Sequence, residues 1–253
     1  MTYDEAGTLT TTTGTPQHVT FTGSRGNLTT VATSANASTT LYRHFTYYDT
    51  GNPKTSTAVS TSSTVNGATT TYNYTAGTAS CGNSFATSVS EPLSLSHSMT
   101  WNCTGGVQLK ATDENGAVTS STYTDTSFWR PSKTTDATLK DTMYAYTGAN
   151  SVESSLTFNG GASTVDVLST LDSMGRSSLS QIKQSPTSTS YDSTQTEYDS
   201  VCGVRRTSLP YSAASGTTNP TGPGPATTFD GMCRPTQTAD KWRRNGLVHL
   251  LEK

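Results

Sequence analysis

One short motif recurs along this chain and limits what the chain can fold into. An aromatic residue or Leu is followed by Asp, by a few spacers and by Gly, often with Arg next. In a hairpin turn, Asp accepts backbone N–H groups two residues on, and Gly takes the positive φ that closes the turn. The repeat therefore predicts a series of β-hairpins. The residues of the predicted turn motif are Tyr3, Asp4 and Gly7; Tyr48, Asp49 and Gly51; Asp172, Gly175 and Arg176; Tyr198, Asp199 and Gly203; and Phe229, Asp230 and Arg234.

Two of these copies depart from the pattern at a cysteine. Cys233 stands where the motif has Gly, and Cys202 precedes Gly203, which places that glycine one residue late. A side chain at a positive φ costs about 1 kcal/mol. We therefore expect these two turns to be distorted. Four arginines follow the motif turns, and we expect them to pair with carboxylates or carbonyls of neighbouring strands: Arg176, Arg205, Arg206 and Arg234.

The composition agrees with exposed, one-sided strands. Ser and Thr fill 88 of 253 positions, whereas Leu, Ile, Val and Phe fill 35. So few large apolar residues argue against a helical bundle and against an α/β enzyme with a buried parallel sheet. A net charge of −2 argues against both disorder and a basic nucleic-acid binder. Thr and Tyr suit pleated, half-exposed strands, so the predicted fold class is all-β.

The motif Tyr-Asp-x-x-Gly-Arg, flanked by Thr-rich strands, resembles the YD repeat of Rhs and teneurin-type proteins. The resemblance covers residues 1–240 and implies repeated antiparallel hairpins that join into an extended, curled sheet or partial shell. In Rhs proteins such a shell encloses a C-terminal toxic domain, and in teneurins it belongs to an adhesion receptor. The partners implied are the remaining repeats, a C-terminal toxin domain, and a carbohydrate or cell-surface receptor.

The ends and one internal segment differ from the repeats. The run 210–225 holds four Pro and three Gly, which predicts a loop. Residues 241–253 form a short basic and Leu-rich tail in which a turn of helix fits. The chain starts inside a motif, so we expect a fragment of a longer protein. It shows neither a signal peptide nor an apolar span, and the resemblance implies a secreted or cell-surface location as part of that protein.

The cysteines and histidines do not form a metal motif. Cys81, Cys103, Cys202 and Cys233 lie far apart with no Cys-x-x-Cys pair, and the four His residues show no ligand spacing either. The sequence therefore predicts no metal site and no cofactor. A disulfide between Cys81 and Cys103 is the alternative in an oxidising compartment, whereas free, partly buried thiols are the favoured state.

No catalytic motif is present. The chain contains neither Gly-x-Ser-x-Gly nor His-Glu-x-x-His, and it has no glycine-rich phosphate loop. The motif aspartates are explained by their turns. We therefore predict a non-enzymatic structural segment that encloses or presents another domain. The alternative is a surface adhesin-like module whose exposed aromatic residues bind carbohydrate or a receptor.

Overall fold

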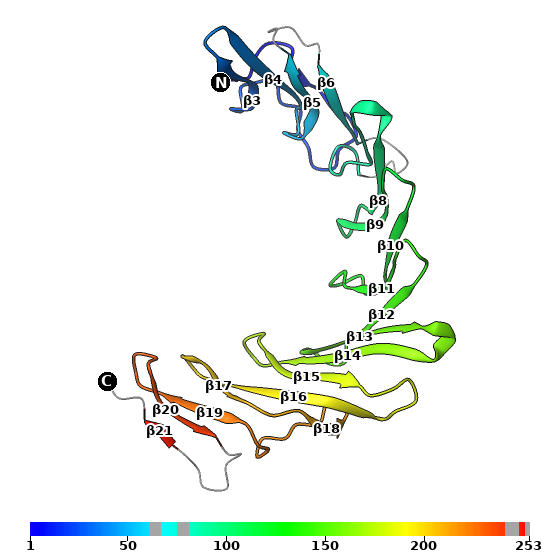
Figure 1. Cartoon of the computed structure of the whole chain (residues 1–253). Coiled ribbons are helices and arrows are strands. Elements are labelled where there is room, and N and C mark those ends of the chain that lie inside the picture. Colours follow the sequence, from blue (N-terminus) through cyan, green and yellow to red (C-terminus); the bar gives the residue numbers. More distant parts are fainter. Residues whose placement is uncertain (61–66, 75–80, 241–247, 251–253) are drawn as a thin grey trace. The chain divides into compact units, whose positions relative to one another are not determined.

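The chain folds almost entirely into β-strands. The computed structural model describes residues 1–60, 67–74, 81–240 and 248–250. Within these residues, strand follows strand in antiparallel hairpins, which confirms the predicted all-β class (Figure 1). The helices described are two short 3-10 turns, η1 (Pro92–Ser94) and η2 (Asn159–Gly161). No helix in these ranges is long and apolar enough to cross a membrane.

The chain divides into two compact units, Met1–Pro131 and Ser132–Lys253. In the first unit, each of the strands from β3 to β9 pairs antiparallel with the next strand in the chain. The parallel pair β2–β4 and the antiparallel pair β1–β3 hold the N-terminal residues. The strands of this unit are β1 (Thr2–Tyr3), β2 (Leu9–Thr10), β3 (Leu28–Asn36), β4 (Thr39–Tyr48), β5 (Pro53–Ser60), β6 (Ala68–Asn73), β7 (Ser88–Ser90), β8 (Ser96–Asn102), β9 (Val107–Thr112) and β10 (Val118–Tyr123).

The second unit continues the same antiparallel order from β11 to β16. Strand β16 then pairs with two strands, β18 along its first half and β17 along its second half. Strands β19, β20 and β21 follow β17 in turn. The strands are β11 (Pro131–Thr135, which begins at the unit boundary), β12 (Asp141–Ala145), β13 (Ser151–Phe158), β14 (Ser163–Leu171), β15 (Ser177–Lys183), β16 (Ser190–Asp199), β17 (Gly203–Thr207), β18 (Tyr211–Ala214), β19 (Pro225–Phe229), β20 (Pro235–Asp240) and β21 (Val248–Leu250).

The Pro/Gly-rich run is only partly the loop that the sequence predicts. Tyr211–Ala214 forms β18, which pairs with Ser190–Ser193 of β16. These four residues contain no Pro or Gly, so their backbone donors are available for the ladder. The prediction of a loop across all of 210–225 is therefore wrong for β18.

Most of the predicted tail lies outside the described residues, which exclude 241–247 and 251–253. Val248–Leu250 forms β21 and pairs with β20, with Leu250 opposite Gln237. This part of the tail is therefore a strand and not the turn of helix that fits its sequence.

The buried side chains are largely polar. The buried apolar residues described are Tyr74, Cys81, Val89, Leu168, Leu179 and Tyr191. The alternation of buried and exposed residues along β15 places Leu179 and Gln181 on one face. The Gln181 amide donates to Ser193 Oγ at 2.8 Å and to the Ala214 carbonyl at 3.0 Å, and its oxygen accepts from the Gly216 N–H at 2.6 Å. Gln181, with its amide groups hydrogen-bonded, is therefore buried on the same face as Leu179.

Candidate functional site

The repeated turn has one well-defined form, seen at Asp172. The N–H of Asp172 donates to the Arg176 carbonyl at 2.8 Å, and the N–H of Gly175 donates to the Asp172 carbonyl at 3.0 Å. The carboxylate accepts the N–H groups of Met174 and Arg176, each at 2.9 Å. Gly175 has a φ of 78°. We call this five-residue arrangement the short Asp turn.

The copy at Asp230 has the same geometry although Cys233 replaces Gly. Its carboxylate accepts the N–H groups of Met232 and Arg234 at 2.9 Å, and the Cys233 N–H donates to the Asp230 carbonyl at 2.9 Å. Cys233 has a φ of 61°. The predicted distortion is therefore absent, because the turn hydrogen bonds hold the cysteine in the left-handed conformation.

Two more short Asp turns lack the aromatic residue of the motif. In the turns that begin at Asp113 and Asp136, the carboxylate accepts the amides of the second and fourth following residues at 2.7–2.9 Å. The positive-φ position holds Gly116 in one turn and Leu139, with a φ of 62°, in the other. Thr precedes both aspartates, so the aromatic residue in the search pattern excluded them. Asp at the first position is the informative signal.

A second form of the turn is one residue longer. In this long turn, the Asx side chain accepts the amides of the second and third following residues, and a positive φ falls at the fourth. The late glycine of the Asp199 copy belongs to this form and is not a distortion. The long turns described begin at Asn102, Asp125 and Asp199 and have their positive φ at Gly106, Trp129 and Gly203.

Asp4 does not close its predicted turn. Its own φ is 49°, and its carboxylate accepts the hydroxyl of Ser24, the N–H of Gly26 at 2.6 Å and the N–H of Asn27 at 3.0 Å. Gly7 has the expected positive φ of 79°. Strand β1 pairs with β3 and not with the strand that follows it, so the carboxylate binds the segment before β3.

Asp49 also differs from the prediction. It is fully buried, and its carboxylate accepts the N–H of Thr12 at 2.9 Å and the hydroxyl of Thr12 at 2.6 Å. His18 Nε2 lies 3.2 Å from its second oxygen. Burial alone would raise the pKa of Asp49, but the hydrogen bonds from Thr12 and the nearby His18 hold the pKa below its usual value. The Thr12 hydroxyl donates its proton to the Asp49 carboxylate, so the His18 imidazole is not placed to act as a base toward this hydroxyl.

The arginines of the motif bind their own turns. Arg176 and Arg234 each place a guanidinium nitrogen 2.7 Å from the aspartate four residues earlier. The expected pairing with neighbouring strands is therefore wrong for Arg176 and Arg234. It is right for Arg206, whose guanidinium donates to Glu197 of the neighbouring strand β16 at 2.8 Å. The Arg176 backbone N–H, its guanidinium and the Met174 N–H together lower the pKa of Asp172.

The motif aromatics occupy different environments. Tyr3 is 56% exposed, and Phe229 is half-buried in β19. Tyr48 packs edge-to-face on Tyr74, with 5.4 Å between the ring centroids. The Tyr198 ring lies under the Arg176 guanidinium at 4.1 Å, which links two neighbouring turns because β15 pairs with β16.

All four cysteines form disulfides, Cys81 with Cys103 and Cys202 with Cys233. The favoured free thiols of the sequence analysis are therefore wrong. The second bridge joins the long turn at Asp199 to the short turn at Asp230. The two cysteines that interrupt the turn motif thus cross-link neighbouring hairpins. Their pairing is not evident from the sequence, because they are 31 residues apart.

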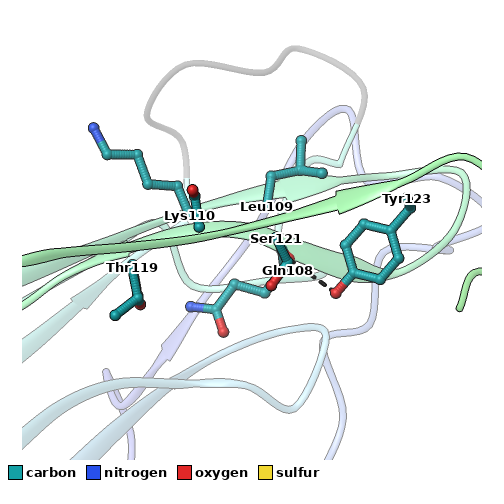
Figure 2. A pocket seen from close by; sticks show the side chains of 8 residues that line it. Gln108, Leu109, Lys110, Thr119, Ser121 and Tyr123 are labelled. Carbon is teal, nitrogen blue, oxygen red and sulfur yellow. Dashed lines mark hydrogen bonds between the residues drawn. The ribbon is translucent and has the colours of Figure 1, made fainter. Parts of the chain in front are cut away.

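The described residues form several surface hollows, and two of them bear on ligand binding. The first, of about 100 Å³, lies between β9 and β10, where Tyr123 donates to the Gln108 carbonyl at 3.2 Å beside Lys110 and Ser121 (Figure 2). Ligand pockets usually exceed about 300 Å³, so this one is too small for a sugar residue. The second, of about 390 Å³, is lined by Val31, Thr33, Leu41, Tyr42, Arg43 and Phe45.

A scan against protein-family models finds no match, and a search of curated proteins finds none. Among solved structures, the chain is similar to the one described as "Crystal Structure of TcdB2-TccC3-Cdc42", with a TM-score of 0.48 and 13% identity over 87% of this chain. The structures described as TcdB2-TccC3-TEV and TcdB2-TccC3 give TM-scores of 0.36 at 12% identity, over 90% and 89% of this chain. The chain spans 14% to 16% of those chains.

Proposed function

We propose that this chain is a non-enzymatic structural segment of an Rhs-type YD-repeat protein. It forms part of a β-wall that encloses or presents a C-terminal toxin or other domain. The observation that carries the proposal is the short Asp turn, which recurs with one hydrogen-bond pattern at Asp113, Asp136, Asp172 and Asp230. The partners of the segment are the remaining repeats and the enclosed domain.

The construction of the sheet supports a wall more than a self-contained globule. Each short Asp turn is closed by its own aspartate, so a hairpin needs no distant residue to fix its end. Few apolar side chains are fully buried among the described residues, and most strands contact their neighbours along the chain. Repeats of this kind gain stability from adjacent repeats, as in other stacked arrays.

The disulfides support a secreted or cell-surface location. Disulfide bonds persist in oxidising compartments and are rare in the cytosol. Two bridges use all four cysteines of the chain, and one of them ties two hairpin turns together. A protein that acts outside the cell would keep both bonds.

The aspartates support the absence of catalysis. Asp172, Asp199 and Asp230 accept backbone amides at the first positions of their turns, and Asp49 accepts Thr12 and lies beside His18. A general acid or base needs a carboxyl group that is free to exchange a proton with a substrate. These carboxylates are occupied by the fold.

Protease protection in the complete gene product tests the proposal. We expect the domain that follows the repeats to resist cleavage. Replacement of both Asp172 and Asp230 by Ala should expose this domain to the protease by loosening two hairpin ends. Asp192 is exposed within β16, so Asp192→Ala should leave the protection unchanged. Equal cleavage of the domain with and without the repeats would overturn the enclosing role.

A second function, carbohydrate or receptor binding, is favoured by the apolar hollow on β3 and β4. Tyr42 and Phe45 border it, and the Arg43 guanidinium lies 6.0 Å from the Phe45 ring centroid. An aromatic surface beside a cation suits stacking against a sugar ring. We expect a folded chain to bind on a glycan array and Phe45→Ala to lose that binding. An array without signal would remove this candidate.

A further inference from the structure

Three side chains with metal-binding atoms gather at one end of strands β7, β8 and β9. Glu91, His97 and Glu114 each offer one ligand atom, and these atoms all lie within 4.8 Å of one another. We propose that they form a binding site for zinc or a similar divalent transition metal. No closely spaced ligand pair marks this group in the sequence, because His97 and Glu114 are 17 residues apart.

The strand register explains how Glu91 and His97 meet. Val89 of β7 lies opposite His97 of β8. Glu91 is two residues beyond Val89, so it points to the same face as His97 and lies diagonally across the pair. The Glu91 N–H donates to the Leu95 carbonyl at 2.8 Å, which closes the β7–β8 connection and fixes the backbone of Glu91.

The third ligand comes from the turn after β9. Ser98 lies opposite Thr112, which brings the short turn at Asp113 beside His97. The carboxylate of Asp113 is used by its own turn, where it accepts two amides at 2.9 and 2.7 Å. Glu114 remains free to project toward the imidazole, and its Oε1 lies 3.0 Å from His97 Nδ1.

The charge of the group favours a cation. Glu91 and Glu114 hold two carboxylates close to one imidazole, and within the described part of the chain neither forms an ion pair with Lys or Arg. Carboxylates this close repel each other unless a positive charge lies between them. A divalent cation would supply that charge, and it would connect the β7–β8 connection to the β9–β10 turn.

The donor set selects the metal class. One imidazole nitrogen and two carboxylate oxygens suit zinc, whereas calcium and magnesium prefer oxygen ligands alone. Zinc ligands lie about 2.0–2.2 Å from the metal, so two of them around a tetrahedral ion are separated by about 3.4 Å. The 3.0 Å contact between His97 and Glu114 is close to that separation. Three protein ligands leave a fourth position for water.

Isothermal titration of the full oxidised chain with zinc chloride, after treatment with EDTA, tests the site. We expect one zinc ion per chain and no binding of calcium chloride. Even outer partners of metal ligands contribute about 10- to 100-fold to affinity, so His97→Gln should weaken binding by at least about 100-fold. Glu91→Gln and Glu114→Gln should each weaken it by at least about tenfold.

Glu5→Gln is the matched control, since it makes the same change elsewhere in the first unit and should bind zinc as the wild type does. Circular dichroism checks that every variant is folded. If His97→Gln does not fold, the Glu91→Gln/Glu114→Gln double variant carries the test. Wild-type affinity in a folded His97→Gln or Glu91→Gln variant, or no zinc binding by the wild type, would overturn the proposal.

Discussion

The turns at Tyr48–Asn52 and Asp172–Arg176 have the same backbone hydrogen bonds, but their aspartate side chains bind different groups. In both, the first N–H donates to the fifth carbonyl and the fourth N–H donates to the first carbonyl, at 2.8–3.0 Å. Asp172 occupies the first position and binds its own turn. Asp49 occupies the second position, and its carboxylate reaches Thr12 and His18 instead.

One residue of spacing therefore changes the role of the aspartate. Gly lies three residues after Asp172 but two residues after Asp49. With the first spacing the carboxylate faces the amides of its own turn, and with the second it is free to bind another segment. The same motif thus closes a local hairpin at Asp172 and holds distant residues together at Asp49.

The largest expected effect comes from the bridge that joins two local turns. Replacing Cys202 and Cys233 by Ser should lower the free energy of unfolding by about 3 to 4 kcal/mol, because the bond constrains a 31-residue separation in the unfolded chain. Urea unfolding followed by circular dichroism measures it. Replacing Cys81 and Cys103, with a separation of 22 residues, should cost slightly less. Unchanged stability in both variants would contradict this role of the bridges.

Asp49→Ala should be the most damaging single change at a motif aspartate. It removes the acceptor of the Thr12 N–H and the carboxylate that lies beside His18 Nε2, at a cost of about 3 kcal/mol in the free energy of unfolding. Urea unfolding against the wild type measures this cost. If Asp49→Ala lowers the free energy of unfolding no more than Asp172→Ala does, the proposed difference between the two aspartates is wrong.

Asp172→Ala should cost less, about 1 to 2 kcal/mol, because its carboxylate is partly exposed and caps a local turn much as an N-cap residue caps a helix. Asp230→Ala should behave alike, since its hydrogen bonds have the same lengths. Urea unfolding of the two variants checks the equivalence. A cost for one at least twice that for the other would show that the turns are not equivalent.

Leu139→Gly should stabilise the protein by up to about 1 kcal/mol. Leu139 has a φ of 62° and is 80% exposed, so Gly relieves backbone strain and little apolar contact is lost. Gly116→Ala, at the same turn position, should destabilise by a similar amount. Thermal unfolding of the two variants measures whether each is stabilised or destabilised. A destabilised Leu139→Gly variant would contradict the presence of backbone strain at Leu139.

The smallest effect concerns Glu153, which contrasts with Asp49. Burial and the nearby Asp166 carboxylate raise the pKa of Glu153 above its usual value near 4.5. The folded state therefore holds this proton more tightly than the unfolded state. Ionised Glu153 lowers the free energy of unfolding, so this loss of stability is absent below pH 4.5 and grows as the pH rises through the raised pKa. Glu153→Gln should be more stable than the wild type at neutral pH and equal to it in acid. Urea unfolding at both pH values checks the sign, and a constant difference between them would contradict it.

The sequence was informative where the signal was local. The turns at Asp172, Asp199 and Asp230 lie where the motif predicts them, because an aspartate and a positive-φ residue at short spacing are enough to define a turn. Turn residues and Thr-rich alternation were also enough for the all-β class.

The rest depends on residues that the fold brings together from far apart. The bond between Cys202 and Cys233, the contact of Asp49 with Thr12 and the approach of Glu114 to His97 all follow from strand register. A repeat pattern does not fix register across several strands. Leu139 shows a further limit, since a local turn can place a bulky residue at a position that the motif reserves for Gly.

The claim that each short Asp turn is closed by its own aspartate is tested most directly by amide hydrogen exchange in the Asp172→Ala variant. The amides of Met174 and Arg176 donate to this carboxylate, and those of Met232 and Arg234 donate to the equivalent one. We predict faster exchange at Met174 and Arg176 alone, with the Asp230 turn unchanged. Unchanged exchange at Met174 and Arg176, or equal acceleration at both turns, would contradict the account.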